Sequence, residues 1–115
     1  MTRIIIVGSK GRMGQALLSC ASRMAEVEVV GALDEGDDLT SVIDQCDGVI
    51  EFSFHTVTPG VAELCAKHGK FLVIGTTGHT EEEKSRVCRL TPQAVNLYLS
   101  KIPATPAHYG RYSVR

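Results

Sequence analysis

The sequence lacks the features that mark several specialised classes of protein. It has 12 Lys and Arg against 13 Asp and Glu, and this near balance gives no overall basic character to suggest a nucleic-acid partner. No apolar run approaches the length of a membrane span, and no charged-then-apolar leader with a small-residue cleavage site opens the chain. We therefore expect a cytoplasmic protein with neither nucleic acid nor membrane as a partner.

Cysteine and histidine do not have the spacing of metal ligands or of a disulfide framework. Cys20, Cys46, Cys65 and Cys88 are far apart and form no CxxC pair. Cys20 and Cys65 fall in helical patterns, where a free cysteine behaves as a small apolar residue. We expect core or half-buried thiols and no metal site, and these residues identify no catalytic acid, base or nucleophile.

Residues 4–18 contain a strand, a glycine turn and the start of a helix. The β-branched run from Ile4 to Val7 predicts a buried strand, and Gly8, Gly11 and Gly14 follow it at a spacing of three. Glycine lets a ligand approach the backbone, and the N–H groups that open a helix favour an anion. The turn therefore predicts a pyrophosphate site. The alternative is a tight turn without a ligand, because GxGxxG is the commoner spacing.

Strands and helices are expected to alternate along the chain. The predicted strands are 3–7, 27–33, 49–52, 71–74 and 94–99, and the predicted helices are 11–24, 39–46, 59–68 and 80–90. The strands are nearly continuous in apolar residues, as strands buried on both faces of a sheet must be. The pattern predicts an α/β fold with a doubly wound parallel sheet. A chain of 115 residues is long enough for one domain, and we expect it to span 1–100, with an irregular tail over 101–115.

The ends and faces of the helices are also predicted. In the first helix, Met13, Ala16, Leu17 and Cys20 recur at helical spacing and are expected to share one face. Thr80 is the expected N-cap of the last helix, because three glutamates follow it in the first turn, where the helix dipole favours carboxylates.

Asp34 is the candidate ligand of an adenosine ribose. It stands 26 residues after Gly8, at the end of the second predicted strand, where a carboxylate in a dinucleotide fold accepts hydrogen bonds from both ribose hydroxyls. The alternative is a solvated acid in the acidic loop 34–38. A carboxylate repels the 2′-phosphate of NADP, but Lys10 and Arg12 in the neighbouring turn could offset that repulsion. The sequence therefore favours NADH and leaves NADPH open.

Two other loops follow strands at the edge where ligands bind in open α/β sheets. The loop Gly75-Thr76-Thr77-Gly78 combines close approach with hydroxyl groups, and Phe52-Ser53 ends the third predicted strand. Their alternatives are an ordinary strand-to-helix loop and the end of a buried strand. His55 and His79 fall in the same region, and we expect solvated loop histidines rather than cofactor or substrate contacts.

Several motifs together resemble the N-terminal half of the dihydrodipicolinate reductase family, also called 4-hydroxy-tetrahydrodipicolinate reductases. The resemblance covers residues 1–90. The Gly-Arg-Met-Gly turn and the Gly-Thr-Thr-Gly loop are specific when they occur at this separation. The matching segments are Val7-Gly8-Ser9-Lys10-Gly11-Arg12-Met13-Gly14, Gly31-Ala32-Leu33-Asp34, Val49-Ile50-Glu51-Phe52-Ser53 and Val73-Ile74-Gly75-Thr76-Thr77-Gly78.

The resemblance implies a Rossmann-like fold and an enzyme that uses NADH or NADPH. It would reduce the cyclic product of aspartate semialdehyde and pyruvate during lysine and diaminopimelate synthesis. The implied ligand of the adenosine ribose is Asp34, and Thr77 would lie close to the substrate. The resemblance places the cofactor pyrophosphate at Gly8, Ser9, Lys10, Gly11, Arg12 and Met13, and the nicotinamide end at Phe52, Ser53, Gly75, Thr76 and Thr77.

The chain departs from the family pattern in two places. Glu51 replaces the family's Asp, and after residue 100 there is no match to the family's substrate-binding domain, which supplies a His-His and Lys set and the sheet of the homotetramer. We expect a truncated chain or a shift in reading frame near residues 90–100, with little turnover by this chain alone. The alternative is a non-catalytic NAD(P)-binding regulatory or sensor module. A weaker alternative, the cofactor domain of a homoserine or aspartate dehydrogenase, is disfavoured by the Gly-Thr-Thr-Gly loop.

Overall fold

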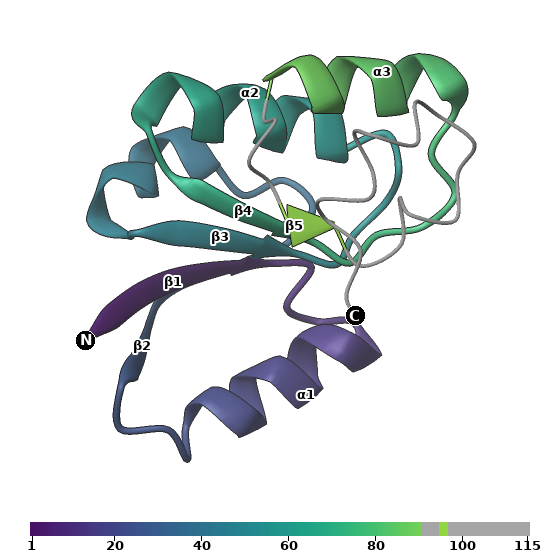
Figure 1. Cartoon of the computed structure of the whole chain (residues 1–115). Coiled ribbons are helices and arrows are strands. Elements are labelled where there is room, and N and C mark those ends of the chain that lie inside the picture. Colours follow the sequence, from purple (N-terminus) through teal and green to yellow (C-terminus); the bar gives the residue numbers. More distant parts are fainter. Residues whose placement is uncertain (91–94, 97–115) are drawn as a thin grey trace.

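The computed structural model describes residues 1–90 and 95–96, and its centre is one parallel β-sheet (Figure 1). The order of strands across the sheet is β2-β1-β3-β4-β5, and every pairing is parallel. The strands are β1 (Thr2–Val7), β2 (Val27–Leu33), β3 (Gly48–Glu51), β4 (Phe71–Ile74) and β5 (Val95–Asn96).

Helices cover both faces of the sheet, which confirms the predicted doubly wound α/β fold. Helix α1 (Arg12–Ala21) lies on one face, and α2 (Thr58–His68) and α3 (Glu81–Leu90) lie side by side on the other (Figure 1). Because α1 and α2 leave adjacent strands towards opposite faces, the loops after β1 and β3 separate at the carboxyl edge of the sheet.

The hydrophobic core lies between the sheet and α2. Side chains alternate between the faces of a strand, so Ile5, Val49 and Leu72 form one row across β1, β3 and β4 on the α2 side. All three are almost fully buried, and Val61 and Cys65 of α2 pack against the same cluster. Burying an aliphatic side chain of this size contributes about 1.5–3 kcal/mol, so these rows fix the register of the central strands.

Strand β2 differs from the expectation that every strand is buried on both faces. It lies at the edge of the sheet and pairs only with β1, and none of its residues is fully buried. Its apolar sequence did not indicate its burial. How much of a strand is covered depends on its place in the sheet, and that place depends on the whole topology.

Most residues of the apolar face predicted for α1 are exposed. Gly14 and Ala21 are buried and Leu17 is half-buried, whereas Met13 and Cys20 are exposed. The helix also ends at residue 21, three residues earlier than expected, and continues as tight turns. The spacing of apolar residues alone does not say which residues of a helix are buried, and in α1 these are the small residues Gly14 and Ala21.

The remaining helix boundaries follow from local chemistry. Thr80 caps α3 as expected: the Glu83 N–H donates to Thr80 Oγ1 at 3.2 Å, and the Thr80 N–H donates to Glu83 Oε1 at 2.8 Å. Gly69 ends α2 in the left-handed conformation, with φ of 68°.

Two predictions differ from the structure or fall outside it. Residues 39–46 were expected to form one short helix but instead form the 3₁₀ turns η1 (Leu39–Ser41) and η2 (Ile43–Gln45). Val42 interrupts them with a φ of −121°, and the break lets Leu39 and Ile43 both reach the core. The fifth predicted strand is present as β5, and the rest of 94–99 and the predicted irregular tail lie outside the described residues.

Gly8 is expected to contribute strongly to the stability of the fold. Its φ is +90°, and a Cβ would overlap the Phe52 carbonyl oxygen. Gly36 has almost the same φ, +91°, but open space around it. Gly8→Ala should lower the free energy of unfolding by about 2 kcal/mol or more, and Gly36→Ala by about 1 kcal/mol, as measured by urea denaturation. Equal losses in the two variants would show that β1 and β3 do not approach each other this closely.

Candidate functional site

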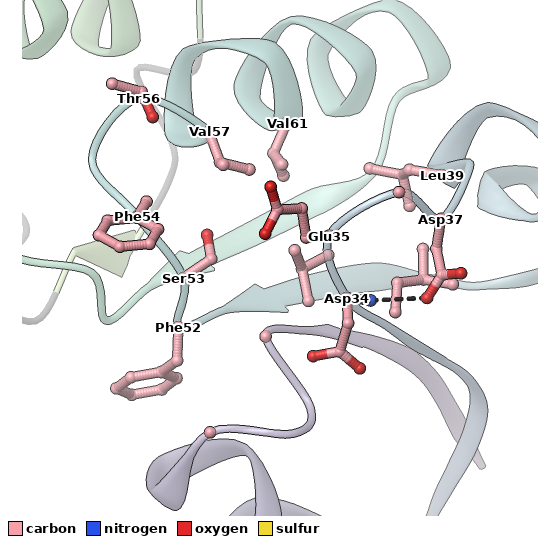
Figure 2. A pocket seen from close by; sticks show the side chains of 15 residues that line it. Asp34, Glu35, Asp37, Leu39, Phe52, Ser53, Phe54, Thr56, Val57 and Val61 are labelled. Carbon is pink, nitrogen blue, oxygen red and sulfur yellow. Dashed lines mark hydrogen bonds between the residues drawn. The ribbon is translucent and has the colours of Figure 1, made fainter.

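A cavity of about 560 Å³ lies at the carboxyl edge of the sheet, where the loops after β1 and β3 separate (Figure 2). Its size is typical of ligand sites, and switch points of this kind are where open α/β sheets bind their ligands. Figure 2 shows the acidic loop after β2 on one side and the loop after β3 on the other. The lining residues are Val7, Gly8, Gly11, Leu33, Asp34, Glu35, Gly36, Asp37, Leu39, Phe52, Ser53, Phe54, Thr56, Val57 and Val61.

The glycine turn and the start of α1 adjoin this cavity through Gly8 and Gly11. The turn is tied to β2, because the N–H groups of Gly8 and Ser9 donate to the Leu33 carbonyl at 2.8 and 3.2 Å. Helix α1 then begins without a side-chain cap and without an acidic residue in its first turn. The amides at its start therefore have no side-chain acceptor among the described residues, and they suit an anion.

Gly11 lines the cavity without being required by the fold. Its φ is −71°, which any residue can adopt. Apart from its immediate neighbours in the chain, a Cβ at this position would come closest to the Gly8 carbonyl oxygen, at 3.5 Å, which is an ordinary van der Waals contact. A Cβ at position 11 therefore fits the protein, at a position that lines the cavity. This separates the binding role of the turn from its structural role.

Asp34 is held against the glycine turn. Its carboxylate accepts hydrogen bonds from Ser9 Oγ and from the Lys10 N–H, the latter at 2.9 Å, and these two donors lower its pKa. An ionised carboxylate has about four acceptor positions, so two remain beyond those bonds. Asp34 is therefore an anion with free acceptor positions at the mouth of the cavity.

The loops after β3 and β4 meet through Phe52. Its ring lies where a side chain at position 75 would be, so glycine is needed there, and the Gly75 N–H donates to the Glu51 carbonyl at 2.8 Å. Thr76 is buried and Thr77 is exposed. None of the residues 75–77 lines the cavity, so the candidate site consists of the cavity and an adjoining surface beyond Phe52.

The structure brings most of the sequence-predicted site residues to one edge of the sheet. Gly8, Gly11, Asp34, Phe52 and Ser53 line the same cavity. The other predicted members differ in exposure: Lys10, Arg12 and Met13 are exposed on the turn, Ser9 is buried and hydrogen-bonded to Asp34, and Gly75, Thr76 and Thr77 lie beyond Phe52.

Sequence reasoning missed a buried polar cluster beside this cavity. Glu51 is fully buried at the end of β3 and accepts hydrogen bonds from the hydroxyls of Ser53, Thr58 and Thr76. His79, expected to be solvated, is 8 % exposed and contacts Thr58 Oγ1 through Nε2 at 2.8 Å. The signal was a glutamate inside an apolar strand, since a buried charge requires hydrogen-bond partners.

Burial changes the titration of several side chains in this region. It raises the pKa of Glu51, which the three hydroxyl donors partly oppose, and it lowers the pKa of His79. Burial also raises the pKa of Cys65 to about 12, with a contribution from the nearby Glu51 charge.

Cys46 and Cys65 are buried thiols, as predicted, whereas Cys20 is exposed. His55 is partly exposed and contacts Glu83 Oε1 through Nδ1 at 2.8 Å.

Residues 1–90 and 95–96 contain neither a metal-binding cluster nor a membrane-spanning helix. In this part of the chain no cluster of His, Cys, Asp and Glu could hold a metal ion. No helix here has the length and apolar character needed to cross a bilayer.

The burial of Glu51 predicts a pH dependence of stability. A carboxyl whose pKa is raised on folding adds stability that is fully present below its unfolded pKa and is lost as the pH rises through its folded pKa. The free energy of unfolding of the unaltered chain, minus that of Glu51→Gln, should therefore fall as the pH rises above the ordinary pKa of glutamate, about 4.5. Urea denaturation followed by circular dichroism measures this difference, and both proteins retain His79 and Cys65. A difference that stays constant or grows with pH would contradict the burial of an ionisable group at this position.

Comparison with solved structures identifies the fold. A dipicolinate-bound dihydrodipicolinate reductase from Paenisporosarcina sp. TG-14 superposes with a TM-score of 0.70 at 25 % identity, over 78 % of this chain and 43 % of that chain. A signal receiver domain of a diguanylate cyclase from Desulfovibrio desulfuricans G20 superposes with a TM-score of 0.62 at 15 % identity, over 97 % of this chain and 90 % of that one. The second likeness concerns the fold alone.

Sequence comparison identifies the family. A family model described as "Dihydrodipicolinate reductase, N-terminus" matches residues 2–101. Two relatives named 4-hydroxy-tetrahydrodipicolinate reductase are similar: one from Desulfotalea psychrophila is 36 % identical over 72 % of this chain and 39 % of its own length, and one from Akkermansia muciniphila is 37 % identical over 76 % and 35 %. This chain thus spans about two fifths of the length of these relatives. The chain belongs to the dihydrodipicolinate reductase family and corresponds to the N-terminal part of its members.

Proposed function

We propose that this chain is the cofactor-binding half of an NADH-dependent 4-hydroxy-tetrahydrodipicolinate reductase. The observation that supports this most strongly is the placement of the glycine turn and Asp34 on one cavity at the switch point of the sheet. The names of the family model and of the relatives support the reaction assigned to the whole protein, reduction of 4-hydroxy-tetrahydrodipicolinate to tetrahydrodipicolinate in lysine and diaminopimelate synthesis.

The pyrophosphate would bind at the start of α1. The amides there have no side-chain acceptor among the described residues, and the absence of side chains at Gly8 and Gly11 leaves room for close approach. Lys10 and Arg12 are exposed on the same turn and would add positive charge near the phosphates. The chain therefore offers both hydrogen-bond donors and charge to a pyrophosphate.

The adenosine would occupy the cavity itself. The two acceptor positions left on Asp34 would receive the ribose hydroxyls, because the Ser9 and Lys10 bonds already orient the carboxylate. Val57 and Val61 form an apolar side of the cavity that suits the face of a purine (Figure 2).

The acidic loop after β2 supports NADH rather than NADPH as the cofactor. It contains Asp34, Glu35, Asp37 and Asp38 and no basic residue. Asp34 has a lowered pKa and stays ionised at neutral pH, so a 2′-phosphate placed beside it would meet a negative charge. The charge of Lys10 also lowers the pKa of Asp34, but less than the two hydrogen bonds do, so we expect Lys10 to offset this repulsion only partly.

The nicotinamide end would lie on the surface beyond the cavity. Phe52 and Ser53 connect the cavity to the loop after β4, where the Gly75 and Thr76 backbone would contact the nicotinamide ribose and carboxamide. Thr77 is exposed there and would face the substrate. NADH supplies the hydride for the reduction, and this half of the protein would orient it.

Calorimetric titration of the 115-residue chain tests the proposal. We expect NADH to bind, NADPH to bind more weakly, and Gly11→Leu to reduce NADH affinity at least about tenfold while the fold remains intact. Gly60→Leu is the matched control, because Gly60 also has open space around it but lies on α2 and does not line the cavity. A folded chain that binds neither dinucleotide, or a Gly11→Leu variant that binds as well as the unaltered chain, would refute the proposed site.

A further inference from the structure

The buried carboxylate of Glu51 joins three segments that are separate in the sequence. The side chain lies on the α2 side of β3, in a row with Val7 and Ile74 of the neighbouring strands, and is fully buried. Leaving a charge in this environment without partners would be very costly. Its partners are hydroxyls from the loop after β3, from the start of α2 and from the loop after β4.

The ionised form of Glu51 fixes the direction of every hydrogen bond in this cluster. A carboxylate can only accept, so the hydroxyls of Thr58 and Thr76 donate to it, at 3.0 and 2.8 Å. Each of these hydroxyls then accepts from a nitrogen: Thr76 Oγ1 from the Ser53 N–H at 2.8 Å, and Thr58 Oγ1 from His79 Nε2 at 2.8 Å. Every polar group named here has a hydrogen-bond partner, and the ionised carboxylate allows only one assignment of donors and acceptors.

This arrangement sets the position of one loop against the other. The Ser53 N–H reaches Thr76 Oγ1, and the Ser53 hydroxyl reaches Glu51 itself. The Gly75 N–H is bound to the Glu51 carbonyl at 2.8 Å, so main chain and side chain of one residue hold both loops. By contrast, Asp34 at the other end of the site bonds to Ser9 and Lys10, which belong to a separate group of contacts.

We propose that Glu51 is a positioning residue for the nicotinamide end of the cofactor. Its carboxylate holds the loops after β3 and β4 in the arrangement that receives nicotinamide, and the adenosine end binds without its help. This inference rests on the proposed function, because it assumes that the two loops form the nicotinamide site. Glu51 acts through Ser53 and Thr76 and is not expected to touch the cofactor.

ADP distinguishes this role from a general effect on folding, because it has the adenosine and pyrophosphate of NADH but neither the nicotinamide nor its ribose. Glu51→Gln keeps the size of the side chain but directs an NH₂ group towards hydroxyls that donate. We expect it to weaken NADH binding about tenfold, as loss of a hydrogen bond to a charged group would, and to change ADP affinity less than about twofold. The change in nicotinamide fluorescence that accompanies NADH binding should also be reduced.

Glu63→Gln is the matched control. Glu63 is an exposed glutamate of α2 that pairs with Arg86 at 2.7 Å, and its substitution should change neither affinity. Thr58→Val is the second variant, in case Glu51→Gln does not fold. It preserves the branched shape, removes one donor to Glu51 and the acceptor of His79, and should show the same selective loss of NADH affinity.

The outcomes separate the two proposals. If the unaltered chain binds neither NADH nor ADP, the proposed function fails. If the unaltered chain binds both ligands and a folded Glu51→Gln loses both equally or loses neither, the role assigned to Glu51 is overturned. If Glu51→Gln is unfolded, Thr58→Val decides in the same way: selective loss of NADH affinity supports the positioning role, and an equal loss or no loss overturns it.

Discussion

The close approach of β1 and β3 at their carboxyl ends determines the rest of this structure. The Phe52 carbonyl lies where a side chain of Gly8 would be, and the Phe52 N–H donates to the Val7 carbonyl at 2.9 Å. This contact places the glycine turn beside the loop after β3, while α1 and α2 leave towards opposite faces of the sheet (Figure 1). The cavity is the space that these diverging segments leave, so its position follows from the topology.

Two carboxylates at this edge have opposite environments, which suit them to different tasks. Asp34 lies in a partly exposed loop, where hydrogen bonds from Ser9 and Lys10 lower its pKa and leave acceptor positions for a ligand. Glu51 is buried among hydroxyls that use its acceptor positions, and burial raises its pKa. The first is suited to contact a ligand directly, and the second is suited to hold the protein groups that surround one.

Local signals in the sequence were sufficient for the order of elements, and the sheet, the glycine turn and the Thr80 cap are confirmed. Each depends on residues close together in the chain: a β-branched run, a glycine spacing, or a threonine followed by glutamates. The burial pattern of α1, the half-burial of β2 and the burial of His79 depend on how distant segments pack. Glu51 belongs to the second group, because its partners at positions 58 and 76 become neighbours only in the folded sheet. The roles of the site residues in cofactor binding remain predictions.

The central claim is that one ligand extends along the carboxyl edge of the sheet, from the loop after β2 to the loop after β4. The most direct test is to follow the backbone amide resonances of the isotope-labelled chain by NMR during an NADH titration. The account predicts shifts at three separate places, the Gly8–Met13 turn, Asp34 and its neighbours, and residues 53 and 75–77, with little change on the outer faces of α2 and α3. Shifts confined to one loop, or located on those helices, would contradict it.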